Sequence, residues 1–205
     1  MPEAIDHRRA VAERNVEAIL DAAEAILQRR SQASISAVAN EAGVSRVTVY
    51  SHFPTRERLL EVVVERAVRR ATIALEAAEP GRGDPVDALE RVIAAAWREL
   101  DSNRALAHAT AERMSSEAMT RSHEAAQRPL GELAERGRAE GAFRTDVPTE
   151  WLVTSCFALI HACGDEVRAA RLNPSTAPDI LTATIRDVFV GKRDVGDGRP
   201  GRPSG

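Results

Sequence analysis

One short stretch of this chain, residues 46–52, carries side chains whose chemistry suits the recognition of a nucleic acid. It reads RVTVYSH and so combines a guanidinium, two hydroxyls, a phenol and an imidazole within seven residues. Val49 and Phe53 are four residues apart, so on a helix they share one side and are expected to face inward. The side chains left outside are Arg46, Val47, Thr48, Tyr50, Ser51 and His52. Groups of these types bond phosphate oxygens and base edges.

The sequence around this stretch predicts two short helices joined by a tight turn. Apolar residues with the i, i+3, i+4, i+7 spacing of one helical face predict a first helix over 35–42: Ile35, Val38, Ala39 and Ala42. Ser34 is placed to cap this helix, and Gly43 follows it where helices often end in a left-handed conformation. Ser45 would cap a second helix over 46–52, which Pro54 would stop. Such a short connection is typical of a DNA-binding helix-turn-helix.

Together these residues resemble the signature of the TetR family of bacterial transcriptional regulators. The matching pattern, AxxAGVSxxTVYxHFPTRExLL, comprises Ala39, Ala42, Gly43, Val44, Ser45, Thr48, Val49, Tyr50, His52, Phe53, Pro54, Arg56, Glu57, Leu59 and Leu60. The preceding link, QRRSQAS, differs from the family, which usually has a glycine and an aromatic residue there. A second, weaker resemblance lies at GAFRTDVPTEWL, residues 141–152.

The periodicity and the resemblance together predict an all-α protein of about nine helices in two domains. A helix-turn-helix DNA-binding domain is expected over 9–55, and a helical ligand-binding and dimerisation domain over 56–190. Flexible tails are expected at 1–8 and 191–205. A helix starting near Thr55 would link the two domains, and in the family this link is the route by which ligand binding repositions the DNA-reading unit.

Within the first domain, we expect Arg46, Val47, Thr48 and Ser51 to read base edges in the major groove. Arg46 would fork onto a guanine, and Val47 would meet a thymine methyl group. Phosphate contacts are expected from Ser34, Tyr50, His52 and Arg56, the last because it matches a basic residue that contacts phosphate in relatives. Two copies related by a two-fold axis would read the half-sites of a palindromic operator, about 34 Å apart.

For the second domain, the resemblance implies a homodimer and a pocket for a small apolar molecule. The last two helices of relatives pair into a four-helix bundle, which here implies residues 148–171 and 176–190; alternatively, their apolar faces are consumed within one chain. The candidate pocket residues are Trp97, His108, Met114, Met119, Phe157 and His161. Each of them has a simpler alternative role in the core or on the surface. The two histidines lack metal-ligand spacing, and we expect no cofactor and no metal ion.

The charge of the chain neither demands nor excludes a nucleic-acid partner. Hydrophobic residues make up 43% and charged residues 29%, as in a soluble globular protein, and the net charge is −3. Residues 1–70 carry 11 arginines against 10 acidic residues, so the negative balance lies in the remainder. A near-neutral unit can bind DNA if its arginines share a face, with an affinity sensitive to salt.

The sequence gives little support to other classes of protein. It contains no GxSxG, no HExxH, no phosphate-binding loop and no Cys/His pair at a useful spacing, so no enzyme is indicated. Cys156 and Cys163 are seven residues apart, about 10 Å along a helix, and are expected to be small buried residues. There is no apolar run near the length of a membrane span and no apolar signal segment, so we expect a cytoplasmic protein.

These observations predict a ligand-responsive transcriptional regulator, most simply a repressor that binds a palindromic operator as a homodimer. The alternative is a ligand-independent architectural DNA-binding protein, which would bind without regard to sequence and have a filled core.

Overall fold

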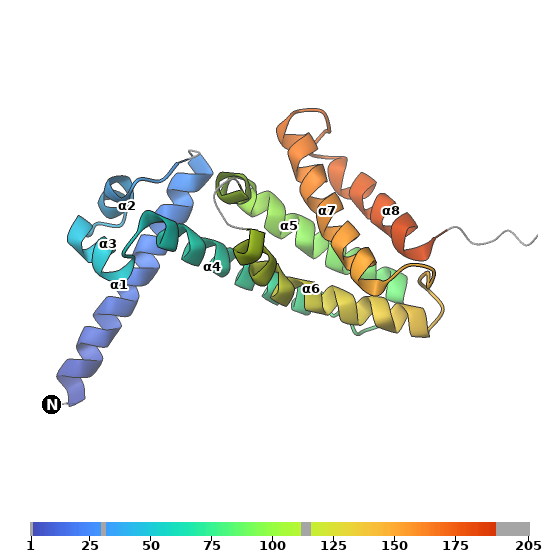
Figure 1. Ribbon diagram of the computed structural model, residues 1–205, viewed down its shortest axis with the longest axis horizontal. Helices are drawn as coiled ribbons and strands as arrows, with labels where there is room; N and C mark the ends of the chain where they lie inside the picture. The colour runs from blue at the N-terminus through green and yellow to red at the C-terminus, as the bar shows by residue number, and fades with distance from the viewer. Residues whose placement is uncertain (1, 30–31, 112–115, 192–205) are drawn as a thin grey trace, which may run out of the picture.

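The computed structural model describes residues 2–29, 32–111 and 116–191, with side chains at all of these except 2–9, 104–123 and 125. This part of the chain is all helical, as predicted, and none of its helices combines the length and apolar character needed to cross a bilayer. The helices are α1 (Pro2–Arg29), α2 (Ile35–Glu41), α3 (Arg46–His52), α4 (Arg56–Ala77), α5 (Pro85–Ala111), α6 (Ser116–Ala139), α7 (Thr149–Arg168) and α8 (Ala177–Val190). Figure 1 shows a small N-terminal lobe around α1–α3 and a larger C-terminal lobe containing α5–α8, with α4 running from one to the other.

Each lobe has its own hydrophobic core, and α4 contributes to both. The N-terminal core combines α1, α2, α3 and the first half of α4, from which Leu59, Leu60 and Val63 are buried. The C-terminal core begins at Leu75 and takes in α5–α8. The change from one core to the other therefore lies inside α4, between Val63 and Leu75. Because a single helix of 22 residues runs through both cores, α4 mechanically joins the two lobes.

Two helices differ from the sequence prediction in extent. The first, α1, begins at Pro2 instead of near Arg9, so residues 2–8, expected to form a flexible arm, continue the helix. The second, α5, forms one element over Pro85–Ala111, although Asn103 within it has the non-helical angles φ −114° and ψ 15° and bends the helix. The described residues therefore form eight helices and not about nine. The predicted C-terminal tail, from residue 192 onward, lies outside the described residues.

The C-terminal lobe is closed where the end of α6 meets the end of α8. Beyond the end of α6, Gly141 adopts φ +72°, and the amide of Ala142 donates to the Gly137 carbonyl at 2.8 Å. The chain then places Phe143 edge-on against Phe189, with ring centroids 5.3 Å apart and an interplanar angle of 80°. Both rings are buried, so this pair anchors the link between α6 and α7 to α8.

Both cysteines are buried on α7, as predicted. Burial raises the pKa of the Cys156 thiol to about 12, which keeps the thiol protonated near neutral pH. The Cys163 thiol lies 3.8 Å from the carbonyl oxygen of Ala177, a contact between α7 and the start of α8. Cys156 therefore has the character of a small core residue and not that of a reactive nucleophile.

Candidate nucleic-acid interface

The helices α2 and α3 are both capped by serine hydroxyls, as the sequence predicted. Ser34 Oγ accepts a hydrogen bond from the amide of Ala37 at 3.2 Å, and Ser45 Oγ accepts one from the amide of Thr48 at 3.0 Å. Between the helices, Gly43 adopts φ +67°, a conformation that a β-carbon would strain. The caps and this glycine fix where α2 ends and α3 begins, using only residues close in sequence.

The inner side of α3 is anchored in the N-terminal core. Val49 is fully buried, Phe53 is nearly so, and Val44 packs against the same core from the turn. Burial of an apolar side chain of this size contributes roughly 1.5–3 kcal/mol. The two predicted inward residues are therefore confirmed, and they determine which side of this two-turn helix is left for solvent.

The opposite side of α3 is open to solvent. Val47 is 78% exposed and Tyr50 is 45% exposed. Arg46 and Ser51 are also exposed, and Thr48 and His52 are half-buried. Because Val47 does not pack against the protein, its methyl groups remain available for an apolar contact such as that with a thymine methyl. None of the six side chains predicted to lie on the outside of this segment is buried.

Two hydroxyls of this face have hydrogen-bond partners within the unit itself. Thr48 Oγ1 lies 2.8 Å from Ser45 Oγ, and Ser51 Oγ donates to the carbonyl oxygen of Thr48 at 2.8 Å. In this arrangement Ser51 directs lone pairs, rather than a proton, away from the helix. The sequence alone does not reveal these bonds, although a hydroxyl often bonds a carbonyl of the preceding turn.

Arg56, predicted to contact phosphate, makes an intramolecular hydrogen bond that the sequence did not reveal. Its Nε donates to the carbonyl oxygen of Ala33 at 2.7 Å. Ala33 is buried and directly precedes the cap of α2, so the bond connects the start of α4 to the start of α2. The other predicted phosphate residues have open positions: Ser34 and Tyr50 are exposed and His52 is half-buried. Arg56 thus positions the helix-turn-helix, besides any contact it makes outside the protein.

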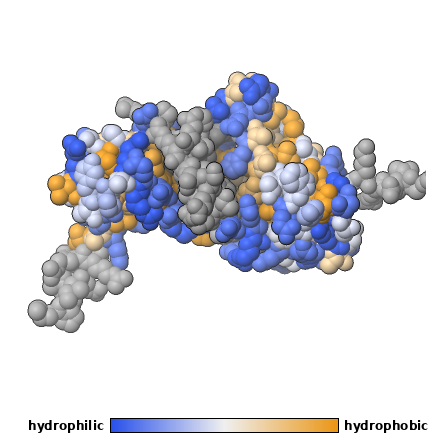
Figure 2. All heavy atoms as spheres, in the orientation of Figure 1, coloured by the Kyte–Doolittle hydropathy of each residue, from blue (hydrophilic) through white to orange (hydrophobic). Residues whose placement is uncertain are grey.

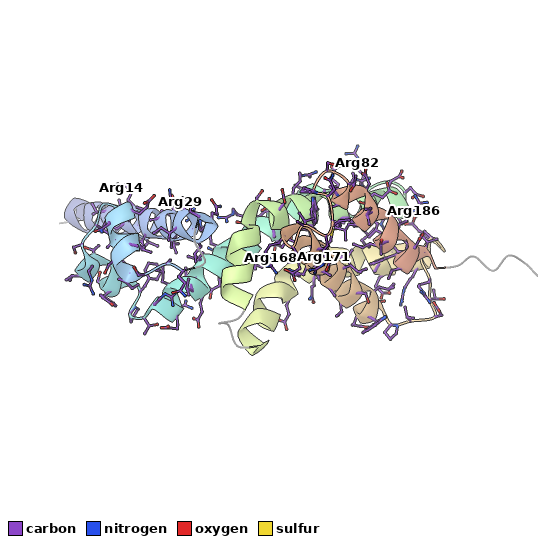
Figure 3. All side chains as sticks on the ribbon, turned by 90° about the horizontal axis from the view of Figure 1, so that it is seen from above. Arg14, Arg29, Arg82, Arg168, Arg171 and Arg186 are labelled. Atoms are coloured by element: carbon purple, nitrogen blue, oxygen red, sulfur yellow. The ribbon has the colours of Figure 1, made fainter. Side chains whose placement is uncertain are left out.

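Arginines are present on both lobes. Figure 3 shows Arg14 and Arg29 on α1 at one end of the molecule, Arg186 on α8 toward the other end, and Arg168 and Arg171 between them. Arg29 is paired with Glu41 of α2 at 2.7 Å, with both side chains largely exposed. A surface pair of this kind adds little stability, but it offsets one positive charge of the N-terminal lobe.

Of the predicted pocket residues, Trp97, Phe157 and His161 have described side chains. Trp97 is buried in the C-terminal core, and Phe157 packs against the same core from α7. His161 lies on an exposed side of α7. Met114 and the side chains of His108 and Met119 lie outside the described residues. Among the residues whose positions are described, no group of three or more His, Cys, Asp or Glu could hold a metal ion.

Comparison with known proteins identifies the N-terminal lobe most clearly. Residues 19–63, from the middle of α1 to the first half of α4, match the family model described as "Bacterial regulatory proteins, tetR family". The transcriptional repressor LfrR of Mycolicibacterium smegmatis is 40% identical over 82 residues, which are 40% of this chain and 43% of LfrR. The regulator EthR of the same organism is 29% identical over 187 residues, 84% of this chain and 83% of EthR.

The similarity to a solved structure extends through the C-terminal lobe. The crystal structure of LfrR in complex with proflavine superposes with a TM-score of 0.66, covering 84% of this chain and 94% of that one. The sequence identity over this match is 23%, so the likeness establishes a shared fold. The match to the LfrR sequence spans less than half of the length of that protein.

Proposed function

We propose that this chain, which belongs to the TetR family of bacterial regulatory proteins, is a ligand-responsive transcriptional regulator that binds a palindromic operator as a homodimer. The observation that carries the proposal is the orientation of α3. Val49 and Phe53 hold it in the core, while Arg46, Val47 and Ser51 are turned to solvent. A short capped helix with this exposed set fits the major groove, where arginine and apolar methyl groups distinguish base pairs.

The test is selection of binding sites from a library of random duplex DNA, followed by footprinting. We expect an enriched palindrome with two half-sites about one helical turn apart. Binding that protects all sequences equally would favour the alternative, a ligand-independent architectural DNA-binding protein. Repression is the regulation we expect, because a repressor is among the proteins with similar sequence.

A homodimer through α7 and α8 is supported by the surface that these helices leave uncovered. They lie side by side (Figure 1), and Figure 2 shows apolar surface over this part of the C-terminal lobe. On α7 the exposed side includes Trp151, at 61% exposure, followed at helical spacing by Thr154, Ala158 and Ala162. On α8 it includes Ile180, at 47% exposure, with Ala183 and Thr184. Large apolar residues bordered by small ones suit close packing against the same helices of a second copy.

Release from DNA by a small apolar molecule is the regulatory part of the proposal. LfrR has been crystallised with proflavine, so this compound is a reasonable first probe for binding to the present chain. Trp97 and Phe157 lie in or against the C-terminal core and are the described candidates for contact with an effector. The two α3 helices of a dimer must be spaced to match the half-sites of the operator. A compound that binds better to a dimer with another α3 spacing would therefore lower the affinity for the operator.

Arg46 tests the base-reading role of α3. Arg46→Ala should cost about 1–3 kcal/mol of operator affinity and relax the preference at one base-pair position in each half-site. Affinities for a panel of operators, each changed at a single position, measure this effect. An equal loss on every member of the panel would show that Arg46 contacts the backbone instead.

Arg56 tests whether one side chain both contacts phosphate and positions the helix-turn-helix. If it contacts phosphate, Arg56→Met should lower the slope of log affinity against log salt concentration by about one per subunit. Loss of the hydrogen bond to Ala33 should also lower the free energy of unfolding by about 1 kcal/mol. A loss of stability with an unchanged salt slope would remove Arg56 from the phosphate contacts and leave only its positioning role.

A further inference from the structure

A network of charged side chains connects α1 to α4 at the base of the N-terminal lobe. Glu17, Asp21 and Glu24 lie on one side of α1, and Arg66 and Arg70 lie one turn apart on α4. Arg66 Nη1 is 3.4 Å from the Glu17 carboxylate, Arg66 Nη2 bonds Asp21, and Arg70 Nη1 donates to Glu24 Oε1 at 3.0 Å. The network holds α4 against α1, which packs against α2 and α3.

Arg70 extends this network to the kink of α5. Its second terminal nitrogen, Nη2, donates to the side-chain oxygen of Asn103 at 3.2 Å. The side-chain nitrogen of Asn103 donates in turn to the carbonyl oxygen of Glu99, one turn earlier in α5, at 2.9 Å. Asn103 is the residue of α5 with non-helical backbone angles. At this bend its side-chain nitrogen bonds the backbone of α5, and its side-chain oxygen bonds Arg70 of α4. We call the set Glu24, Arg70 and Asn103 the junction.

The junction is more enclosed than the surface ion pairs of this protein. The side chain of Glu24 is only 13% exposed, and that of Arg70 is 35% exposed, whereas both partners of the Arg29–Glu41 pair exceed 40%. Reduced access of water strengthens a charge-assisted hydrogen bond and makes its geometry more specific. The junction is therefore a defined mechanical link between the C-terminal lobe and the two helices that carry the DNA-reading unit.

We propose that the junction sets the orientation of the DNA-reading unit on the C-terminal lobe, with the bend of α5 at Asn103 as its adjustable part. The inference rests on the proposed function, because orientation matters through the separation of two reading helices in a dimer. A change in the bend moves the Asn103 oxygen relative to Arg70, and Arg70 is bonded through Glu24 to α1. The bend and the reading unit are then coupled, because a change in one shifts the groups that hold the other.

The first experiment compares Arg70→Met with Arg69→Met in the full-length protein. Arg69 is an exposed residue that directly precedes Arg70 on α4. Arg69→Met removes the same positive charge as Arg70→Met, so it controls for the effect of net charge on DNA affinity. We measure affinity for the selected palindrome and for versions with one base pair added to or removed from its centre. The wild type and Arg69→Met should discriminate among these spacings, and Arg70→Met should lose about tenfold of that discrimination. A merely structural loss would instead weaken all spacings alike.

A second variant keeps the test informative if Arg70→Met folds poorly. Asn103→Ala removes the other end of the bond and introduces a residue that favours helix, so it should fold. It should reduce spacing discrimination in the same direction, and the double variant should lose little more than either single variant, because both break one link. Additive losses in the double variant would contradict the junction.

A measurement without DNA separates failure of the junction from failure of the proposed function. Spin labels at Asn40→Cys on α2 and Ala139→Cys on α6, both exposed positions, report the distance between the lobes, and the two native cysteines are buried. Labelled subunits are diluted into unlabelled protein, and the distance distribution should broaden or shift in Arg70→Met and Asn103→Ala but not in Arg69→Met. If the wild type selects no palindrome, the proposed function fails while these distances still decide the junction. Unchanged distances and spacing discrimination in Arg70→Met would overturn the junction and leave the function standing.

Discussion

Ala158→Arg should abolish operator binding while leaving the subunit folded. Ala158 is exposed at the middle of α7, between the exposed Thr154 and Ala162, on the surface proposed to pair with a second copy. At a packed interface between helices, an arginine there would separate the helices and bury two unpaired charges, one from each subunit. An uncompensated buried charge costs about 3–5 kcal/mol, which is more than a hundredfold in the dimerisation constant. A monomer would contact only one half-site and lose most of its affinity.

Size-exclusion chromatography with light scattering, together with operator titration, measures this outcome. Ala139→Arg is the matched control, since Ala139 is an equally small, exposed residue at the end of α6, outside the two helices proposed to pair. The control should remain a dimer and bind the operator as the wild type does. A dimeric Ala158→Arg protein with full operator affinity would show that the two copies pair through another surface.

Gly137→Ala should destabilise the protein by about 1–3 kcal/mol, although alanine is the better helix former. The buried ring of Phe143 folds back onto Gly137, and an added β-carbon would lie 2.8 Å from its Cγ and closer still to two other ring carbons. The ring has little freedom to retreat, because it packs against the fully buried Phe189. To accept the new methyl group, either α6 must shift or the aromatic pair must separate.

The same helix supplies a control for this substitution. Gly131 also lies within α6, and a β-carbon built there would meet no atom within 4 Å. Gly131→Ala should therefore raise the free energy of unfolding by about 0.5–1 kcal/mol, through helix propensity alone. Urea denaturation of both variants measures the contrast. Two stabilising substitutions would mean that Phe143 does not pack on Gly137 in solution.

The helix-turn-helix was predictable from the sequence because its determinants are local. Ser34 and Ser45 cap helices whose amides lie three residues away, and Gly43 makes the turn between them. Val49 and Phe53 are one turn apart, so their spacing alone indicated the buried side of α3. The predicted bounds of α3, Arg46 to His52, agree with the structure for the same reason. The all-α fold followed from periodicity that repeats along the whole chain.

Helix ends and breaks were less reliably predicted, because the same polar residues occur at both kinks and termini. Asn103 has non-helical backbone angles within α5, and its side chain donates to the Glu99 carbonyl at this bend. Pro129, for example, lies inside α6, which continues on both sides of it. A proline removes only one backbone donor, and packing on either side can keep a helix continuous.

By itself, the sequence indicated the resemblance to the TetR family, the helical fold and the side of α3 that faces solvent, since each depends on residues within a turn or two of one another. The tertiary structure alone decided the hydrogen bond of Arg56 to Ala33, the junction at Arg70, and the contact of Phe143 with Gly137 and Phe189. Most of these contacts join residues tens of positions apart, and their geometry depends on how whole helices pack against each other. That packing reflects the balance of two cores sharing α4, which no local pattern encodes.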